Sequence, residues 1–301
     1  MDIRKEELLK IMEDSTRLAM ERAAAGNELA RLGDPRLEVM TTEHMQFCRI
    51  PEGEFLMGEK LEKVNLPEFF ISRYPITNAQ FTDFVNARGY QQKSYWAEAE
   101  EVGYWKVGVV KGRWDGDNER RTAPADYGEP SNLLNHPVVG VSWYEALAFS
   151  HWLDEKLRKT GGFHVFSEEQ IWEFDEGYRV GLPDEAQWEK AARGTDGREY
   201  PWEGDYFSTN NANTWETSIG ATSAVGCFPG GASPYGVLEM SGNVSEWTTW
   251  DDRKRIVIRG GSFDRSYRGF ALCAYRADWS YPDFGNRYGG FRVVVSPVLL
   301  S

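Results

Sequence analysis

The sequence predicts a loop-rich α+β fold with an added N-terminal helical extension. Three stretches have the apolar spacing and the end signals of helices, and long stretches rich in Gly, Asn, Pro and Trp separate or follow them. Thirty glycines and thirteen prolines suit such a fold better than a helical bundle. Twelve tryptophans suit a core that is poor in regular structure, because each ring buries a large area. The length of 301 residues fits one large domain or two small ones.

The N-terminal extension comprises residues 1–40. Residues 3–31 are expected to form one helix, because their apolar residues roughly follow a helical stripe and Gly33 offers a stop. This helix either docks on the main domain or binds a partner, and docking is the simpler expectation. The main domain is expected to span residues 45–301.

The three helices predicted in the main domain each begin with a capping box, in which the N-cap residue and the residue three positions later bond each other's backbone N–H groups. The pairs are Thr77 with Gln80, Ser142 with Glu145, and Asp184 with Gln187. Short strands are expected at 69–71, 244–250, 256–259 and 291–298.

The chain is acidic, but its charge is uneven. A net charge of −13 argues against nucleic acid and anionic membrane as partners, because both repel an acidic surface. Residues 253–301 nevertheless contain nine Lys and Arg against three Asp. These basic residues either pair with acids elsewhere in the fold or form a basic binding face.

The cysteine content indicates a reducing compartment. The three cysteines, Cys48, Cys227 and Cys273, are too few and odd in number for a disulfide framework. The N-terminus MDIRKEELLK lacks the apolar core of a signal peptide, and no run approaches membrane-span length. We therefore expect a cytoplasmic protein.

One irregular segment near the C-terminus has an unusual composition. Residues 260–292 hold nine aromatic residues and five arginines, with no helical or strand period. A Gly-Gly-Ser motif opens this stretch and a Gly-Phe-Arg motif closes it. The rings either fill a core beneath a long loop or form a binding surface, since exposed apolar clusters usually mark binding sites.

Eight motifs in order give the chain a family resemblance. They are FLMG (55–58), YPITNAQFTDFV (74–85), HPVVGVSWYEALAFSHWL (136–153), LPDEAQWEKAARG (182–194), YPW (200–202), SGNVSEW (241–247), RGGSF (259–263) and GGFRVV (289–294). Together they resemble the formylglycine-generating enzyme, or sulfatase-modifying factor, family over about residues 45–298. The resemblance implies a variant of the C-type lectin fold, with small sheets, few helices and much loop.

The resemblance does not extend to the family's catalytic residues. Its enzymes oxidise a substrate cysteine with copper and oxygen, using a cysteine pair a few residues after the Gly-Gly-Ser motif. Residues 263–272 read FDRSYRGFAL and hold no cysteine, and Cys273 resembles a framework cysteine of the family. A related branch binds iron through three histidines, whose spacing the four histidines here do not match. We therefore expect no catalytic residue and no copper, because a Cu(I) site prefers thiolates.

The chain also resembles the variable proteins of diversity-generating retroelements, which use this domain for binding. In that group, mutagenic reverse transcription varies a C-terminal segment between the GGS and GFRVV motifs, and residues 260–294 match the layout. Rigid rings and small polar residues are typical of adaptable binding surfaces. The resemblance implies an exposed ligand-binding surface made of Arg265, Ser266, Tyr267, Phe270, Asp278, Trp279, Ser280, Tyr281, Phe284, Asn286, Arg287 and Tyr288. The neighbouring rings of Phe263, Tyr275 and Phe291 are expected in the core.

Residues 236–247, GVLEMSGNVSEW, resemble a calcium-binding loop of the family. The resemblance implies a carboxylate from Glu239, backbone carbonyls from Met240, Gly242 and Val244, and Glu246 nearby. Calcium prefers such oxygen ligands, and a tight loop with glycine can present them. The sequence of this loop fits both a structural Ca²⁺ site and a plain turn before a strand.

The sequence thus favours a non-catalytic binding protein whose ligand is a macromolecule, most simply a protein. One alternative is a fixed protein-interaction module of the same fold, which serves a single partner. The other is a copper-dependent formylglycine-generating oxidase, which the missing cysteine pair disfavours.

Overall fold

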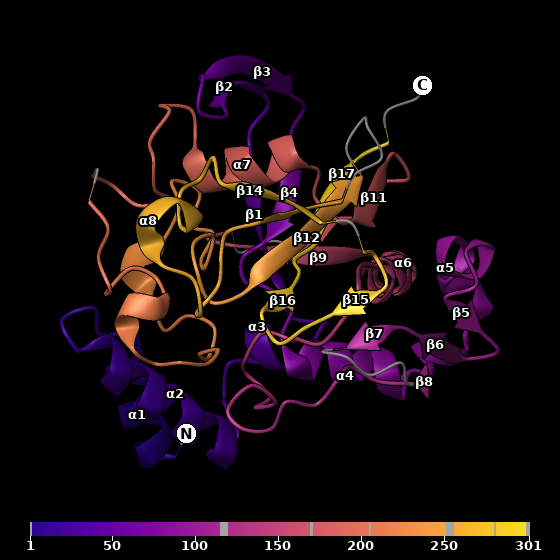
Figure 1. The fold of residues 1–301 in the computed structure, drawn as a ribbon, viewed down its shortest axis with the longest axis horizontal. Coiled ribbons are helices and arrows are strands. Elements are labelled where there is room, and N and C mark those ends of the chain that lie inside the picture. The colour runs from indigo at the N-terminus through magenta and orange to yellow at the C-terminus, as the bar shows by residue number, and fades with distance from the viewer. Residues whose placement is uncertain are drawn as a thin grey trace.

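In the computed structural model, a six-stranded sheet forms the centre of the main domain (Figure 1). The structure describes residues 2–114, 120–168, 171–204, 206–250, 256–279 and 281–298. The sheet has the order β10–β9–β1–β4–β17–β11, with β1 (Gln46–Ile50), β4 (Phe69–Ser72), β9 (Gly162–Val165), β10 (Ile171–Glu173), β11 (Tyr178–Gly181) and β17 (Val294–Pro297). Strand β17 pairs with β4, with Val294 opposite Ile71. The GGFRVV motif therefore returns the end of the chain to the first strands of the domain.

A second sheet of four strands takes two of its strands from the segment with the unusual composition. Its order is β14–β13–β12–β16, with β12 (Ser245–Trp250), β13 (Ile256–Arg259), β14 (Arg276–Trp279) and β16 (Gly289–Gly290). Strands β13 and β14 run antiparallel, whereas β12 and β16 run parallel. The strands predicted at 69–71, 244–250, 256–259 and 291–298 are confirmed as β4, β12, β13 and β17, with small shifts at their ends.

Three smaller sheets lie in the connecting stretches. They are the hairpin β2 (Gly53–Met57) with β3 (Glu62–Leu66), the set β5 (Trp105–Lys106), β6 (Val109–Lys111) and β8 (Arg120–Arg121), and the parallel pair β7 (Arg113–Trp114) with β15 (Phe284–Gly285). The pair β7–β15 joins the long loop after α5 to the C-terminal part of the chain.

The three predicted helices of the main domain are confirmed, capping boxes included. They are α4 (Asn78–Asn86), α6 (Trp143–Thr160) and α7 (Glu185–Arg193). Shorter helical turns are α3 (Leu37–Met40), α5 (Ala97–Glu101), α8 (Tyr267–Phe270), η1 (Gly89–Gln91), η2 (Lys93–Tyr95), η3 (Trp215–Thr217) and η4 (Pro229–Gly231). Each box satisfies backbone N–H groups that the first turn of a helix leaves free.

The prediction of one helix over residues 3–31 is wrong. The extension forms two helices, α1 (Ile3–Glu13) and α2 (Ala19–Leu32), which pack against each other. Between them, the carboxylate of Asp14 accepts hydrogen bonds from the N–H and the hydroxyl of Thr16, at 2.9 and 2.6 Å. Short polar side chains that bond the backbone two residues ahead favour turns over helix, which explains the break.

The two N-terminal helices dock on the main domain, as expected. Leu8, Met12 and Leu29 are buried in one cluster with Cys227 and Phe228. An apolar contact of this kind stabilises the helices where their own propensity would be marginal.

The largest core cluster is rich in aromatic residues, in agreement with the tryptophan content. Trp96 and Trp247 in this cluster, and Trp188 in a second one, are almost completely buried, at 1%, 1% and 0% exposure. Within the described ranges, every helix is too short or too polar to cross a lipid bilayer.

Candidate functional site

The segment of residues 260–294, here called the C-terminal segment, begins and ends at glycines that leave no room for a side chain. Gly261 has a φ of +69°, and a Cβ there would lie 2.5 Å from the carbonyl oxygen of Phe270. At the other end, a Cβ on Gly290 would lie 2.8 Å from the carbonyl oxygen of Val138. The two motifs therefore define where the segment leaves the sheet and where it returns.

Two buried arginines hold the framework beneath the C-terminal segment. Arg292 donates to both carboxylate oxygens of Glu246, at 2.6 and 2.7 Å. Arg259 donates to Glu189 at 2.6 Å and to the carbonyl oxygen of Cys273 at 2.8 Å. All four charged side chains are at most 1% exposed. Losing one partner of such a pair leaves a buried charge, so these contacts hold the surrounding strands in one arrangement.

Backbone hydrogen bonds anchor the segment between its two glycine motifs. Each runs from an N–H group elsewhere in the chain to a carbonyl oxygen of the segment. The pairs are Gly140 to Asn286 (2.9 Å), Trp143 to Pro282 (3.1 Å), Ser245 to Tyr288 (2.8 Å) and Trp215 to Arg265 (3.0 Å). A backbone carbonyl is present whatever side chain its residue carries. These anchors therefore do not depend on the identity of the residues that they hold.

The exposure of the twelve predicted binding residues is mixed. Three are exposed, namely Arg265, Tyr281 and Arg287, and five are half-buried, namely Ser266, Tyr267, Phe270, Phe284 and Tyr288. Asp278 and Trp279 lie in β14, but their side chains, and Ser280 as a whole, fall outside the described residues.

The prediction that Asn286 is exposed is wrong. Its side chain is 6% exposed, and its Oδ1 accepts the backbone N–H of Tyr288 at 2.9 Å. Asn286 therefore closes a local turn, as asparagine often does. Phe263 and Phe291 are in the core as predicted, at 3% and 0% exposure. Tyr275, for which the core was also expected, is half-buried.

Two exposed arginines of the C-terminal segment lie over aromatic rings, whereas the exposed Arg276 pairs with Glu185 at 2.8 Å. The guanidinium carbon of Arg265 is 5.7 Å from the ring centre of Phe270, and that of Arg287 is 5.3 Å from the ring centre of Tyr288. A cation over a ring face gains electrostatic attraction and keeps its N–H groups available at the edge. The ring of Tyr288 also contacts that of Phe263, with centres 6.0 Å apart.

Glu216, which the sequence analysis missed, organises the first turn of the segment. Its carboxylate accepts the hydroxyl of Ser266 at 2.6 Å and the backbone N–H of Tyr267 at 3.1 Å. Partial burial opposes its ionisation, but hydrogen bonds from Ser266 and Thr214 outweigh this and hold the pKa of Glu216 below its usual value. The carboxylate thus caps α8 from a loop fifty residues away.

Three aromatic residues of the chain between residues 206 and 217 were also missed. Tyr206 and Trp215 are 86% and 68% exposed, and the ring of Phe207 stacks on Tyr267 with centres 4.3 Å apart. Nothing in the spacing of residues 200–217 distinguishes them from ordinary loop aromatics, since their contacts are with residues far along the chain.

The three cysteines are poor candidates for redox chemistry. Cys48, Cys227 and Cys273 are unpaired and buried, and burial raises the pKa of each thiol to about 12. A thiolate is the species that reacts and binds metals, so these thiols are inert at neutral pH. The stretch where the family places its cysteine pair contains α8 and no cysteine.

The two carboxylates of the predicted calcium site are mostly engaged within the protein. Arg292 and the indole N–H of Trp188 occupy the carboxylate of Glu246. Glu239 accepts the N–H of Gly226 with one oxygen, and only its other oxygen lacks a partner. The carboxylates therefore leave one oxygen for a cation, whereas calcium takes roughly six to eight oxygen ligands. In the described part of the chain, no group of three or more His, Cys, Asp or Glu is arranged to hold a metal.

The other three residues of the predicted calcium loop have structural positions. Met240 and Val244 are fully buried, and Gly242 takes a φ of +75°, with its N–H bonded to the carbonyl oxygen of Gly260. A Cβ at Gly242 would lie 2.3 Å from the carbonyl oxygen of Asn213. The loop therefore serves as a tight turn against its neighbours.

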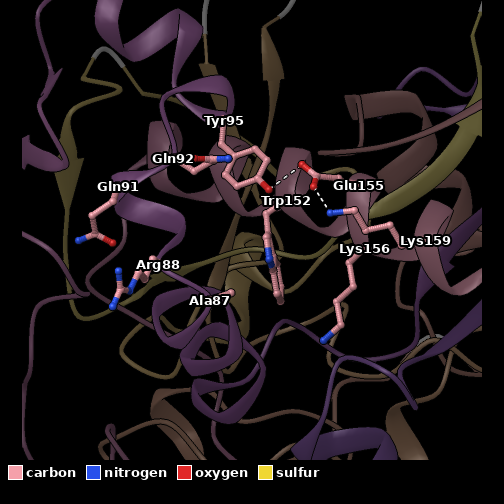
Figure 2. A pocket seen from close by; sticks show the side chains of 9 residues that line it. All are labelled: Ala87, Arg88, Gln91, Gln92, Tyr95, Trp152, Glu155, Lys156 and Lys159. Carbon is pink, nitrogen blue, oxygen red and sulfur yellow. Dashed lines mark hydrogen bonds and ion pairs between the residues drawn. The ribbon is translucent and has the colours of Figure 1, made fainter.

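A separate pocket of about 580 Å³ lies between the end of α4 and the helix α6 (Figure 2). The hydroxyl of Tyr95 donates to Glu155 at 2.7 Å, and Lys159 also pairs with Glu155. Lys156 pairs with Glu43 at 2.5 Å. The lining thus holds three cations, Arg88, Lys156 and Lys159, and one carboxylate, Glu155, and both lysines are paired with acids.

Comparisons with known proteins agree with this architecture. A family model described as the sulfatase-modifying factor enzyme 1-like domain matches residues 36–297. Hercynine oxygenase of Mycobacterium tuberculosis is 29% identical over 232 residues, which cover 75% of this chain but 44% of that protein. The inactive Cα-formylglycine-generating enzyme 2 of Bos taurus is 27% identical over 285 residues, covering 78% of this chain and 82% of that protein.

Among solved structures, the variable protein 1 of Treponema denticola has a similar fold. It aligns with a TM-score of 0.56 and 22% identity, over 83% of this chain and 95% of that one. The fold is thus the loop-rich, C-type-lectin-like α+β fold expected from the motifs. Since the family model covers most of the chain, this protein belongs to the sulfatase-modifying factor, or formylglycine-generating enzyme, family.

Proposed function

We propose that this protein is a non-catalytic binding protein whose C-terminal segment displays a diversified surface rich in rings and arginines. One observation carries the proposal: backbone groups and glycines anchor the segment, while Arg265, Tyr281 and Arg287 point their side chains to solvent. Such side chains can change without loss of the anchors. The similarity in fold to a variable protein supports the same view.

The ligand that suits this surface is a macromolecule, most simply a protein. The exposed and half-buried residues extend from α8 to the end of the segment, which is broader than a small-molecule site. Half-buried rings provide apolar contact area, and exposed arginines provide bonds to acidic groups. The framework is already ordered, so little conformational entropy is lost on binding. The proposal includes a cytoplasmic location, which the three unpaired cysteines support.

A copper-dependent oxidase is the rival within the family, since some relatives are enzymes. Its test is to load the protein with Cu(I) and to supply oxygen and a peptide that contains the sulfatase cysteine motif. We expect no formylglycine, because the thiolates that would bind copper are missing. Turnover of the peptide would overturn the binding proposal.

A fixed interaction module of the same fold is the second candidate, and one observation favours it. Ser266 and Tyr267 use their side chains within the protein, through the bond to Glu216 and the stack on Phe207. Those two positions would lose contacts if they varied. A fixed module predicts that the whole surface is constant among isolates, whereas a diversified one predicts change at the exposed positions.

The deciding experiment is to sequence the locus and several sister isolates. We expect a near-copy of the codons for residues 260–294 beside a reverse-transcriptase gene, with differences only at template adenines. The codons for residues 74–85 serve as the internal control and should not be copied. If no near-copy is found and the segment is constant, the diversified surface is rejected and the fixed module stands.

A further inference from the structure

Exposed aromatic side chains are rare in this structure and gather near the C-terminal segment. In the described ranges, three aromatic side chains are exposed, namely Tyr206 at 86%, Trp215 at 68% and Tyr281 at 52%. Large rings in water forgo the stabilisation that burial gives, so their exposure calls for a reason. Two of the three lie outside the C-terminal segment, in the loop of residues 206–217.

This loop and the start of the C-terminal segment form one surface. The N–H of Trp215 donates to the carbonyl oxygen of Arg265 at 3.0 Å. Glu216, the next residue, binds the start of α8, and Phe207, the neighbour of Tyr206, stacks on Tyr267 at an angle of 11°. These contacts place Trp215 beside Arg265.

The charges on this surface favour an acidic partner. Arg265 and Arg287 are exposed and lie over rings. The carboxylate of Asp264 lies 3.8 Å from Arg265, and no carboxylate among the described residues lies within 4 Å of Arg287. Guanidinium groups of this kind bind carboxylates through paired hydrogen bonds. Trp, Tyr and Arg are also the residues that contribute most at protein interfaces.

We infer that the binding face has a fixed half, made by Tyr206 and Trp215, and that the complete face takes an acidic segment of a partner protein. The inference rests on the proposed binding function and names its partner chemistry. Trp215 packs on an apolar part of the partner, and Arg265 and Arg287 bind its carboxylates. The fixed half provides the same contact area to every partner, whichever side chains the C-terminal segment displays.

Proteins that bind single-stranded nucleic acid also use aromatic rings and arginines, but this surface suits such a ligand less well. Arg265 and Arg287 are two separate cations, and Asp264 offsets one of them, whereas a nucleic-acid backbone needs a continuous positively charged groove. The net charge of −13 adds long-range repulsion of a polyanion. An acidic peptide carries fewer charges and offers apolar side chains as well.

The test is a selection of random peptides displayed on phage against the full-length protein. The peptides that bind are then measured on W215A, on the double variant R265Q/R287Q, and on the controls I171A and R88Q. Ile171 is 58% exposed and lies in β10, and Arg88 lines the pocket in Figure 2. We expect peptides enriched in Asp and Glu whose affinity falls at least about tenfold on W215A and on R265Q/R287Q, and not on the controls.

The other outcomes distinguish between the fixed half of the face, the acidic partner and the proposed binding function. Peptides that lose affinity on R265Q/R287Q but not on W215A would refute the fixed half and leave the binding surface in place. Enriched peptides without acidic residues, or tighter binding of oligo-dT than of the peptides, would refute the acidic partner. No enrichment, or binding that both variants leave unchanged, would refute the proposed binding function itself. Circular dichroism of each variant excludes unfolding as the cause of a loss.

Discussion

Arg292 and Glu246 form a fully buried ion pair with two hydrogen bonds. The pair joins the GGFRVV motif to the second residue of β12. The substitution R292M removes the cation and leaves a buried carboxylate. We expect a loss of unfolding free energy of about 3–5 kcal/mol, because an unpaired buried charge is costly. Urea denaturation measures it directly.

The pair Lys63 with Glu54 is the control for this prediction. It spans 3.0 Å on the surface of the β2–β3 hairpin, with both side chains largely exposed. The substitution K63M should change the unfolding free energy by less than about 1 kcal/mol. Equal effects of R292M and K63M would contradict the role given to the buried pair.

Glu239 makes stability depend on pH. Burial raises its pKa from 4.5 to about 7, against the opposing hydrogen bond from Gly226. The folded pKa lies above the unfolded one. The contribution of protonated Glu239 to the unfolding free energy is therefore fully present below about pH 4.5 and is lost as the pH rises through 7. E239Q should therefore become more stable than the wild type above pH 7, by on the order of 2–3 kcal/mol. Urea melts of both proteins across this range provide the test, and a difference independent of pH would rule it out.

Glu216 should stabilise α8 in the opposite pH sense. Its pKa is held below 4.5, so its contribution is present above that pH and is lost as the pH falls through the folded value. At neutral pH, E216Q should cost about 1 kcal/mol, because glutamine keeps one acceptor oxygen and its nitrogen cannot accept the other of the two bonds from Ser266 and Tyr267. Faster hydrogen exchange at the N–H of Tyr267 is the local readout. The exposed Glu176 provides the control E176Q, which should leave that exchange unchanged.

Gly26 tests the docking of the N-terminal helices. A Cβ at this position would lie 2.7 Å from the Cβ of Ala224 and 3.1 Å from the sulfur of Cys227. Helix propensity alone predicts that G26A stabilises by about 1 kcal/mol. We expect the reverse, a loss of about 1–3 kcal/mol, because the added methyl group overpacks the contact. The exposed neighbour Ala24 provides the control A24G, which should follow propensity, and a gain in stability for G26A would argue against tight docking.

The cysteines should be unreactive in the folded protein. All three are buried with a thiol pKa of about 12, so iodoacetamide should label none of them before unfolding and all of them in urea. The exposed position Ser94 provides S94C as a positive control for labelling. Rapid native labelling of Cys273 would reopen the oxidase hypothesis, and mass spectrometry would identify the site.

Local signals in the sequence were sufficient for much of the fold. The capping boxes at Thr77, Ser142 and Asp184 predicted three helix starts, because a cap and its partner lie within one turn. The glycine motifs marked the limits of the C-terminal segment for a similar reason, since backbone contacts there exclude a side chain. The break at Asp14 also has a local cause and could have been predicted from its neighbour Thr16.

The arrangement of the candidate site depends on contacts between residues that are far apart in the sequence, and no local pattern predicts them. Glu216 and Trp215 meet the C-terminal segment from fifty residues away, and only the folded chain brings them together. Tertiary packing also decided that Asn286 is buried and that Arg292 occupies the carboxylate of Glu246, which its motif had suggested for calcium. The family, the helix starts and the limits of the C-terminal segment could thus be predicted from the sequence alone. Which side chains reach solvent was decided by packing, because burial depends on neighbours that are distant in sequence.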